Sequence, residues 1–194
     1  MLRRNLRTLA RSRRGFTLIE AVVALAILAV IAAAVIPAVA RRVRDGQTSA
    51  IAQTVDAVSE AVAQYRTDVR RYPTRLSHLT AAPALGARDP CGRTVPQAFL
   101  NEWKGPYLQA QVTASGIRIN DATVQDTIRT DPAAFTTTTV GYLLIETQDV
   151  DQEAAEKLDE TYDGADDLAA GLVRFTDLGD DRGTLNFGVR IRGC

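Results

Sequence analysis

The sequence predicts an α+β fold in which one long N-terminal helix packs on an antiparallel β-sheet. Three observations lead to this prediction. Residues 21–40 are continuously apolar, and a single apolar stripe at helical spacing follows them as far as Val69. After Pro73, short runs rich in β-branched residues alternate with turn residues, as in an antiparallel sheet. We expect four parts, whose bounds are residues 1–15, 16–44, 45–72 and 73–194.

The charges of the 194-residue chain cancel, but they are segregated along the sequence. Residues 1–15 carry six arginines and no acidic side chain, and residues 16–44 carry three arginines and one glutamate. The remaining residues hold 14 basic and 22 acidic side chains, a net charge of −8. An apolar content of 46% is that of a globular protein. The acidic body argues against a broad surface for binding nucleic acid.

The apolar run over residues 21–40 is long enough to cross a membrane. As a helix, it covers about 30 Å, the thickness of the hydrocarbon core of a bilayer. Three interpretations compete: a secretory signal peptide, a permanent anchor, or a membrane helix with a second use. The basic N-terminal segment and the small residues Ala38-Val39-Ala40 favour a signal peptide. The length of the run and the carboxylate of Glu20 at its entrance argue against one.

One eight-residue stretch stands where the basic segment meets the apolar run: Arg13-Arg14-Gly15-Phe16-Thr17-Leu18-Ile19-Glu20. It resembles the N-terminal signature of the type IV pilin and pseudopilin superfamily, Gly-Phe-Thr-Leu-Ile-Glu followed by an apolar helix. The resemblance implies that a membrane-embedded prepilin peptidase cuts between Gly15 and Phe16 and methylates the new N-terminus. Residues 1–15 would then be a removable basic leader, which holds its side of the bacterial inner membrane in the cytoplasm.

Glu20 and Pro37 are the two exceptional residues of the apolar helix. An unpaired carboxylate carried towards the centre of a membrane costs about 2–3 kcal/mol. The resemblance implies that Glu20 pairs with the amine of Phe16 in a neighbouring subunit and so sets the axial register of a filament. A simpler interpretation is that Glu20 stabilises the positive end of the helix dipole, and the two are compatible. Pro37 removes one backbone hydrogen bond, so we expect a kink or a loosened turn there.

Beyond Gly46 the apolar residues become periodic. They recur at spacings of four, three, four, three and four residues, at Ile51, Val55, Val58, Val62, Tyr65 and Val69. This stripe fits either a short coiled-coil seam or the face of a helix packed on a sheet, and the resemblance to pilins favours the second. Because Pro73 disfavours helical geometry in the residue before it, we expect a continuous helix over residues 16–71.

Two short elements of the body, residues 72–79 and 103–108, resemble elements of pilins and type II secretion pseudopilins. They read Tyr-Pro-x-x-x-x-x-Leu and Trp-x-Gly-Pro-Tyr-Leu. We expect an antiparallel sheet of four or five strands, at residues 107–113, 117–119, 136–147, 172–176 and 184–191. The first two strands would form a hairpin around Ser115-Gly116. Residues 150–162 predict a short amphipathic helix closed by Gly164.

Cys91 and Cys194 are the two cysteines of the chain. An even number of cysteines in an oxidising compartment favours a disulfide. Pilins often close their C-terminal region with a disulfide, so the resemblance implies a bridge between Cys91 and Cys194. Two thiols and one distant histidine do not suggest a structural metal site.

The acidic residues offer two candidate calcium sites. Four carboxylates have the spacing of EF-hand ligands, at Asp149, Asp151, Glu153 and Glu160. The sixth position of that stretch is alanine rather than the required glycine, and the stretch has a helical pattern, so an EF-hand is disfavoured. Some type II pseudopilins bind calcium near the C-terminus, and by resemblance the candidate ligands here are Asp177, Asp180 and Asp181. A solvated acidic surface is the simpler interpretation, and we expect no obligatory cofactor.

The sequence predicts a structural protein rather than an enzyme. His78 is the single histidine, and no nucleophile has a catalytic partner that the sequence reveals. We expect a subunit of a type IV pilus or type II secretion pseudopilus, anchored once in the bacterial inner membrane with its body in the periplasm. Its expected partners are prepilin peptidase, other pilin or pseudopilin subunits, the inner-membrane assembly platform, and membrane lipid before assembly.

Two other functions stay open at the level of sequence. A membrane-anchored binding module at a pilus tip, for adhesion or DNA uptake, would use a local group of arginines, which is Arg66, Arg70, Arg71 and Arg75. A membrane-anchored hydrolase would need converging catalytic side chains, which the sequence does not reveal.

Overall fold

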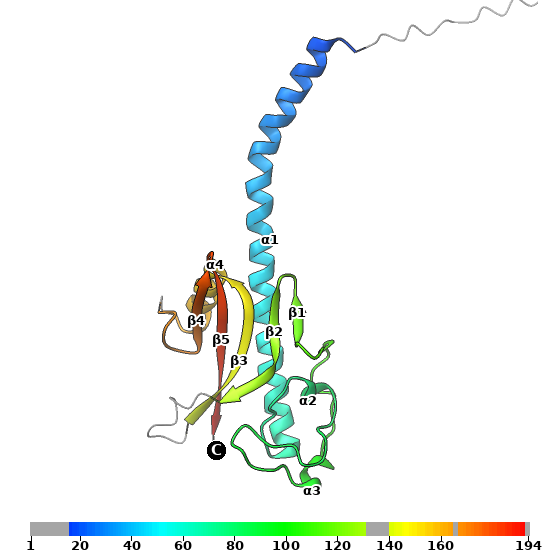
Figure 1. Ribbon diagram of the computed structural model, residues 1–194, viewed down its shortest axis with the longest axis vertical. Coiled ribbons are helices and arrows are strands. Elements are labelled where there is room, and N and C mark those ends of the chain that lie inside the picture. Colours follow the sequence, from blue (N-terminus) through cyan, green and yellow to red (C-terminus); the bar gives the residue numbers. More distant parts are fainter. Residues whose placement is uncertain (1–15, 131–139, 165–166, 193–194) are drawn as a thin grey trace, which may run out of the picture. The chain divides into compact units, whose positions relative to one another are not determined.

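The computed structural model describes residues 16–130, 140–164 and 167–192. Figure 1 shows the long helix α1 (Leu18–Val69), a five-stranded antiparallel sheet and three shorter helices. The predicted α+β fold is therefore confirmed. The other elements, in chain order, are α2 (Ser77–Thr80), α3 (Gln97–Leu100), β1 (Ile117–Ile119), β2 (Ala122–Thr130), β3 (Val140–Asp151), α4 (Gln152–Tyr162), β4 (Val173–Gly179) and β5 (Arg182–Arg192).

The chain forms two compact units, residues 1–42 and residues 43–194. The described part of the first unit is the N-terminal portion of α1. This helix is long and apolar enough to cross a membrane. Its N-terminal portion exposes large apolar residues, whose exposed fractions range from 83% at Leu18 to 49% at Val35. Within the described chain, these side chains therefore have no core to enter.

The C-terminal portion of α1 belongs to the second unit and packs on the sheet through the predicted stripe. All six stripe residues are at most 2% exposed. They share one hydrophobic core with inward-facing residues of the strands, among them Val124, Leu143 and Leu185. The stripe is thus the face of a helix packed on a sheet, and the coiled-coil alternative is excluded for it.

The end of α1 is set by its own backbone. Arg70 adopts a left-handed conformation with φ of 56°, while its N–H still donates to the Arg66 carbonyl at 3.0 Å. The helix therefore stops at Val69, two residues before the predicted end. The prediction of one continuous helix is correct. The helix ends at Val69, however, before the residue whose geometry Pro73 restricts.

The sheet has the strand order β1-β2-β3-β5-β4, and every neighbouring pair is antiparallel. β4 and β5 form a hairpin whose two turn residues, Asp180 and Asp181, both have positive φ, 58° and 57°. Such a two-residue turn follows the right-handed twist of the strands. Helix α4 connects β3 to β4 at the edge of the sheet, and its buried residues are Ala154, Ala155, Leu158 and Asp159.

The first predicted hairpin is wrong. Residues 107–113 do not form a strand, and Ser115-Gly116 instead lies in the turn that leads into β1. β1 pairs with β2, which the sequence analysis missed. The reason is Asp126, an inward-facing position of β2 that is only 6% exposed and interrupts the apolar alternation. Its carboxylate accepts the Ser77 N–H at 2.8 Å, which satisfies the buried charge locally.

The other predicted strands and the second helix are found, with shifted bounds. β3 runs to Asp151, four residues beyond its predicted end, and residues 136–139 lie outside the described part. Val150 therefore belongs to the strand, and α4 begins two residues later than expected. At its other end, Gly164 has φ of 66° and donates its N–H to the Asp159 carbonyl at 3.1 Å, as predicted for a helix C-terminus.

Candidate functional site

The start of α1 has one of the two hydrogen bonds of a helix capping box, the one that the threonine hydroxyl accepts. The Glu20 N–H donates to the Thr17 hydroxyl at 3.3 Å, in a Thr-x-x-Glu sequence whose threonine precedes the first helical residue. This bond satisfies one of the open N–H groups at the helix start. Phe16 is 81% exposed, and Glu20 is exposed as well. Gly15, the predicted cleavage residue, lies outside the described residues.

The carboxylate of Glu20 has no partner within the described chain, so it is open to a group from outside. It lies one helical turn beyond Phe16, at the entrance of the apolar portion of α1. A charged acceptor beside a long apolar face can bind a cation supplied by another molecule while the face is covered. Its role in filament register stays a prediction.

Pro37 lies inside α1, and the residues on both sides of it remain α-helical. The predicted kink or loosened turn at this proline is not tested by the helix assignment and stays a prediction. Two exposed arginines, Arg41 and Arg42, follow shortly after it. We call them the basic pair. Neither arginine has an ion-pair partner among the residues that the structure describes.

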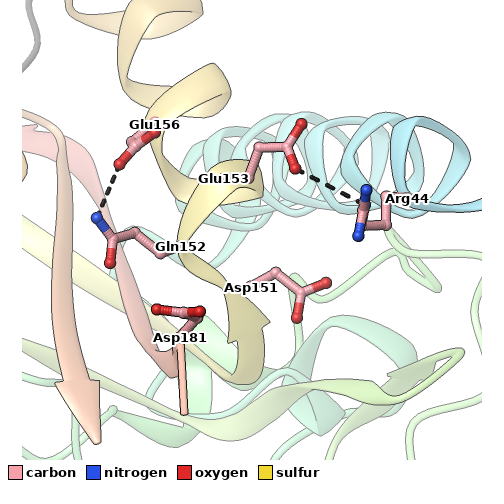
Figure 2. Close-up of a pocket in the computed structure, with 6 residues that line it drawn as sticks. All are labelled: Arg44, Asp151, Gln152, Glu153, Glu156 and Asp181. Carbon is pink, nitrogen blue, oxygen red and sulfur yellow. Dashed lines mark hydrogen bonds and ion pairs between the residues drawn. The ribbon is translucent and has the colours of Figure 1, made fainter. Parts of the chain in front are cut away.

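A polar pocket of about 470 Å³ lies where α4 begins, in the second unit. We call this cavity the polar pocket. Figure 2 shows the residues that line it, which are Arg44, Asp151, Gln152, Glu153, Glu156 and Asp181. Arg44 Nε lies 3.7 Å from the Glu153 carboxylate, and the Gln152 side-chain amide donates to Glu156 at 2.8 Å. The Gln152 N–H donates to the Asp181 carbonyl at 2.9 Å, which ties the β4–β5 turn to the start of α4.

Ion pairs around the polar pocket join α1 to α4. Lys157 Nζ donates to Asp45 of α1 at 2.8 Å and to Glu153 of its own helix at 3.0 Å. The hydrogen bond from Lys157 lowers the pKa of the Glu153 carboxyl, and the bond to Asp45 raises the pKa of the Lys157 ammonium. Arg182 Nε lies 3.2 Å from Asp151, another lining residue of the pocket. These pairs are solvent-exposed, so they orient side chains more than they stabilise the fold.

The three calcium candidates lie in the β4–β5 hairpin, but they do not converge. Asp177 accepts the Gly179 N–H at 2.8 Å, so this carboxylate caps its own turn. Asp180 and Asp181 supply the turn backbone. Among the described residues, no group of three potential ligands is arranged to hold a metal ion. Calcium binding at Asp177, Asp180 and Asp181 remains an untested expectation.

Cys91 lies in a loop that Asp89 organises. The buried Asp89 carboxylate accepts the N–H groups of Cys91 at 3.1 Å and of Arg93 at 2.8 Å. It also accepts the Nε–H of Arg93 at 2.8 Å and lies 3.6 Å from Nε of Arg71, which follows the end of the long helix. Cys194 lies outside the described residues, so the disulfide stays a prediction.

The two body elements with pilin resemblance come together in the structure. The Tyr107 N–H donates to the Leu79 carbonyl at 2.7 Å, and the Trp103 indole donates to the His78 carbonyl at 3.2 Å. The Tyr107 hydroxyl donates to Asp68 at 3.0 Å, which fixes both elements to α1. Residues 72–79 and 103–108 thus pack together and hold the C-terminal end of α1 in place.

The arginine group proposed for nucleic acid is engaged within the fold. The Arg66 guanidinium lies 4.6 Å from the centre of the Tyr72 ring, and that of Arg71 lies 5.2 Å from the Phe99 ring. Arg75 Nη1 lies 3.5 Å from the Asp126 carboxylate. Arginines held by rings and carboxylates have less capacity to neutralise phosphates, so this group is a weak basis for DNA binding.

Residues 10–36 match the family model described as the prokaryotic N-terminal methylation motif. In addition, 85 residues of this chain are 31% identical to the type II secretion system core protein G of Klebsiella pneumoniae. Both matches support the resemblance to the pilin and pseudopilin superfamily. The match covers 44% of this chain and 61% of the Klebsiella protein, which is less than two thirds of that relative. No solved structure matches the chain.

Sequence reasoning missed three charged side chains that hold parts of this chain together. Asp89 and Asp126 gave no signal, because a single acid in a loop or strand does not reveal that it is buried. Lys157 gave a partial signal, since its i, i+4 spacing from Glu153 predicts a helical ion pair. Its second partner, Asp45, is 112 positions away and only the fold brings it near.

Proposed function

We propose that this chain is a structural subunit of a helical filament, processed by prepilin peptidase after Gly15. The relative from Klebsiella pneumoniae favours a type II secretion pseudopilus over a pilus. The observation that carries the proposal is the start of α1, where an exposed carboxylate with no partner among the described residues lies one turn from the future N-terminus. An exposed apolar helix follows directly.

Cleavage between Gly15 and Phe16 creates a new amine at the exposed Phe16. A glycine before the cleaved bond lets a protease approach an extended backbone closely. The leader carries six arginines and keeps its side of the membrane in the cytoplasm until it is removed. The body then lies in the periplasm.

The new amine and Glu20 are complementary groups of neighbouring subunits. They are four positions apart in the chain, and four residues correspond to about 6 Å along a helix axis. In a low-dielectric environment, an amine and a carboxylate attract strongly, and a lone carboxylate is costly. Pairing the Phe16 amine of one subunit with Glu20 of the next therefore removes that cost and sets an axial offset of about one helical turn.

The apolar portion of α1 requires a covering at each stage. Before assembly, membrane lipid covers the exposed side chains. During assembly, the apolar helices of other subunits replace lipid, and an inner-membrane assembly platform extracts each subunit. The acidic bodies then form the outer surface of the filament, which keeps it soluble.

Mass spectrometry of the protein purified from cells with active prepilin peptidase tests the processing step. We expect a mature chain that begins at an N-methylated Phe16. A Gly15→Leu variant should retain residues 1–15, because its side chain blocks the approach of the protease. A wild-type chain that starts at Ala21 or Arg41, or that keeps Met1, would contradict the proposal.

Electron microscopy of filaments from cells that express Glu20 variants tests the register pairing. Glu20→Ala should be cleaved after Gly15 and remain in the membrane without assembling. Thr17→Ala is the matched control, since it removes the helix cap and keeps the carboxylate. It should still give filaments. Normal filaments from Glu20→Ala would rule out the pairing.

A further inference from the structure

The basic pair Arg41–Arg42 is the part of α1 that the proposed function leaves unexplained. Both side chains are exposed and lack ion-pair partners among the described residues. They follow the apolar run at once, where subunits of a filament are closely packed. Two adjacent guanidinium groups in such a place repel one another and their copies unless an acceptor meets them.

The polar pocket has the opposite charge. Its six lining residues include one arginine and four carboxylates, a net charge of −3. Glu153 faces Arg44, and Asp151 faces Arg182. Glu156 accepts only a neutral amide, and the Asp181 carboxylate has no ion-pair partner in the described chain. The pocket therefore has uncompensated acceptors next to an arginine it already holds.

The proposed register brings these two surfaces of neighbouring copies to the same height. If the Phe16 amine of one subunit is level with Glu20 of another, parallel helices are offset by four residues. The neighbouring Arg41 is then level with Asp45, which directly follows Arg44 of the pocket and is bound by Lys157. Both arginines reach outward on long side chains, so they can cross the space between packed subunits.

We propose that the polar pocket of each subunit receives Arg41 and Arg42 of the adjacent copy in the filament. This inference rests on the proposed filament function and on its one-turn offset. The arginines donate to Glu156 and Asp181, and they share Glu153 with the resident Arg44. Planar guanidinium groups suit such multi-acceptor sites, because each presents several N–H donors in a fixed fork. The pairing supplements the Glu20 contact and fixes the rotation of each body about its helix.

Charge reversal with rescue tests the contact in full-length protein. The variant Arg41→Glu/Arg42→Glu faces a pocket of like charge, so filament yield should fall about tenfold or more. The variant Glu156→Arg/Asp181→Asn should give a similar loss. Asn is chosen at position 181 because it tolerates the left-handed backbone there. Combining all four changes should restore at least half of the wild-type yield.

The control variant is Glu102→Arg, which reverses an exposed charge in the turn after α3. It should assemble normally. Every variant should still start at Phe16 and insert in the membrane, because glutamates on the translocated side do not oppose insertion. If wild-type protein forms no filaments, the proposed function fails. If wild-type protein assembles and the charge reversals assemble equally well, only this inference fails.

Cross-linking provides a second readout that does not depend on yield. The pair Arg42→Cys and Glu156→Cys in one chain should give covalent ladders of subunits after mild oxidation of filaments. The pair Arg42→Cys and Glu102→Cys should give none. Ladders that appear equally in cells lacking the assembly machinery would overturn the proposal. So would reversal variants that lose only membrane association, since that outcome assigns the basic pair to anionic lipid headgroups.

Discussion

The phenol of Tyr162, the last residue of α4, donates a 2.8 Å hydrogen bond to the carboxylate of Asp56 on α1. Its ring packs edge-on against Phe187 of β5, with ring centres 4.8 Å apart. One side chain therefore connects the long helix, the short helix and the sheet. Burial and the Asp56 carboxylate raise the pKa of Tyr162 to about 12, from an ordinary value of 10.0.

This contact predicts loss of stability at alkaline pH. Because the folded-state pKa of Tyr162 is raised, its contribution is fully present below pH 10 and is lost as pH rises towards 12. Burial raises the pKa of Tyr65 to about 12 as well, so it adds to the same loss. Tyr162→Phe should reduce the free energy of unfolding by about 0.5–1.5 kcal/mol at neutral pH. It should also flatten the alkaline decline, measured by denaturant unfolding in detergent. An unchanged slope would show that Tyr162 ionises normally.

Removal of the Asp89 carboxylate should destabilise the loop that holds Cys91. Asp89→Ala leaves buried N–H groups and two arginines without their acceptor, so we expect a loss of about 2–3 kcal/mol in the free energy of unfolding. Asp89→Asn keeps one acceptor oxygen for the N–H groups and should lose less. Glu102→Ala, at an exposed position, should change stability by less than about 0.5 kcal/mol. If the alanine and asparagine variants lost equal amounts of unfolding free energy, the Asp89 contacts would not contribute to stability in the way described.

Truncation of a side chain should destabilise the protein on the buried face of α1 but not on its exposed face. Ile51→Ala removes a side chain that is 0% exposed and should lower the free energy of unfolding by about 2–5 kcal/mol. Gln53→Ala lies on the exposed side of the same helix turn and should have little effect. Urea unfolding of the full chain in detergent measures both. Similar values for the two variants would contradict packing of this stripe on the sheet.

The predicted Cys91–Cys194 bridge can be counted chemically. Under denaturing conditions without reductant, neither thiol should react with an alkylating reagent, whereas both should react after reduction. Loss of the bridge in Cys91→Ser/Cys194→Ser should cost about 4–5 kcal/mol in the loop-entropy model, an upper value because native strain subtracts from it. Alkylation of two thiols in the unreduced protein would disprove the bridge.

The sequence predicted the long helix well because its signals are local. A continuous apolar run and a stripe with a helical period require no knowledge of distant residues. The same holds for α4, whose apolar spacing and closing Gly164 were visible in the chain. Its start was misplaced because Val150 fits equally well at the end of a strand, and only pairing of β3 with β5 decides between them.

The sheet was predicted less completely because strand pairing is not local. β2 was missed since Asp126 occupies an inward position, where a charge is tolerated only because Ser77 and Arg75 reach it. Residues 107–113 have a strand-like composition, yet the N–H groups of Tyr107 and Leu108 donate to the Leu79 carbonyl of α2 instead of to a strand. In both cases a tertiary contact overrides a local propensity.

The processing and register residues are predicted from the sequence alone, since Gly15, Phe16 and Glu20 form one ordered signature, and their roles stay predictions. The polar pocket could not be found in this way. Its lining comes from α1, from the β3–α4 junction and from the β4–β5 turn. The residue from α1 is more than a hundred positions away from the other two segments. The sequence by itself determined a basic N-terminal segment, an apolar run and an acidic remainder, and it predicted that the first of these is a leader. Only the tertiary structure decided which of the acidic side chains are neutralised and which stay open, because that depends on distances of a few ångströms between remote segments.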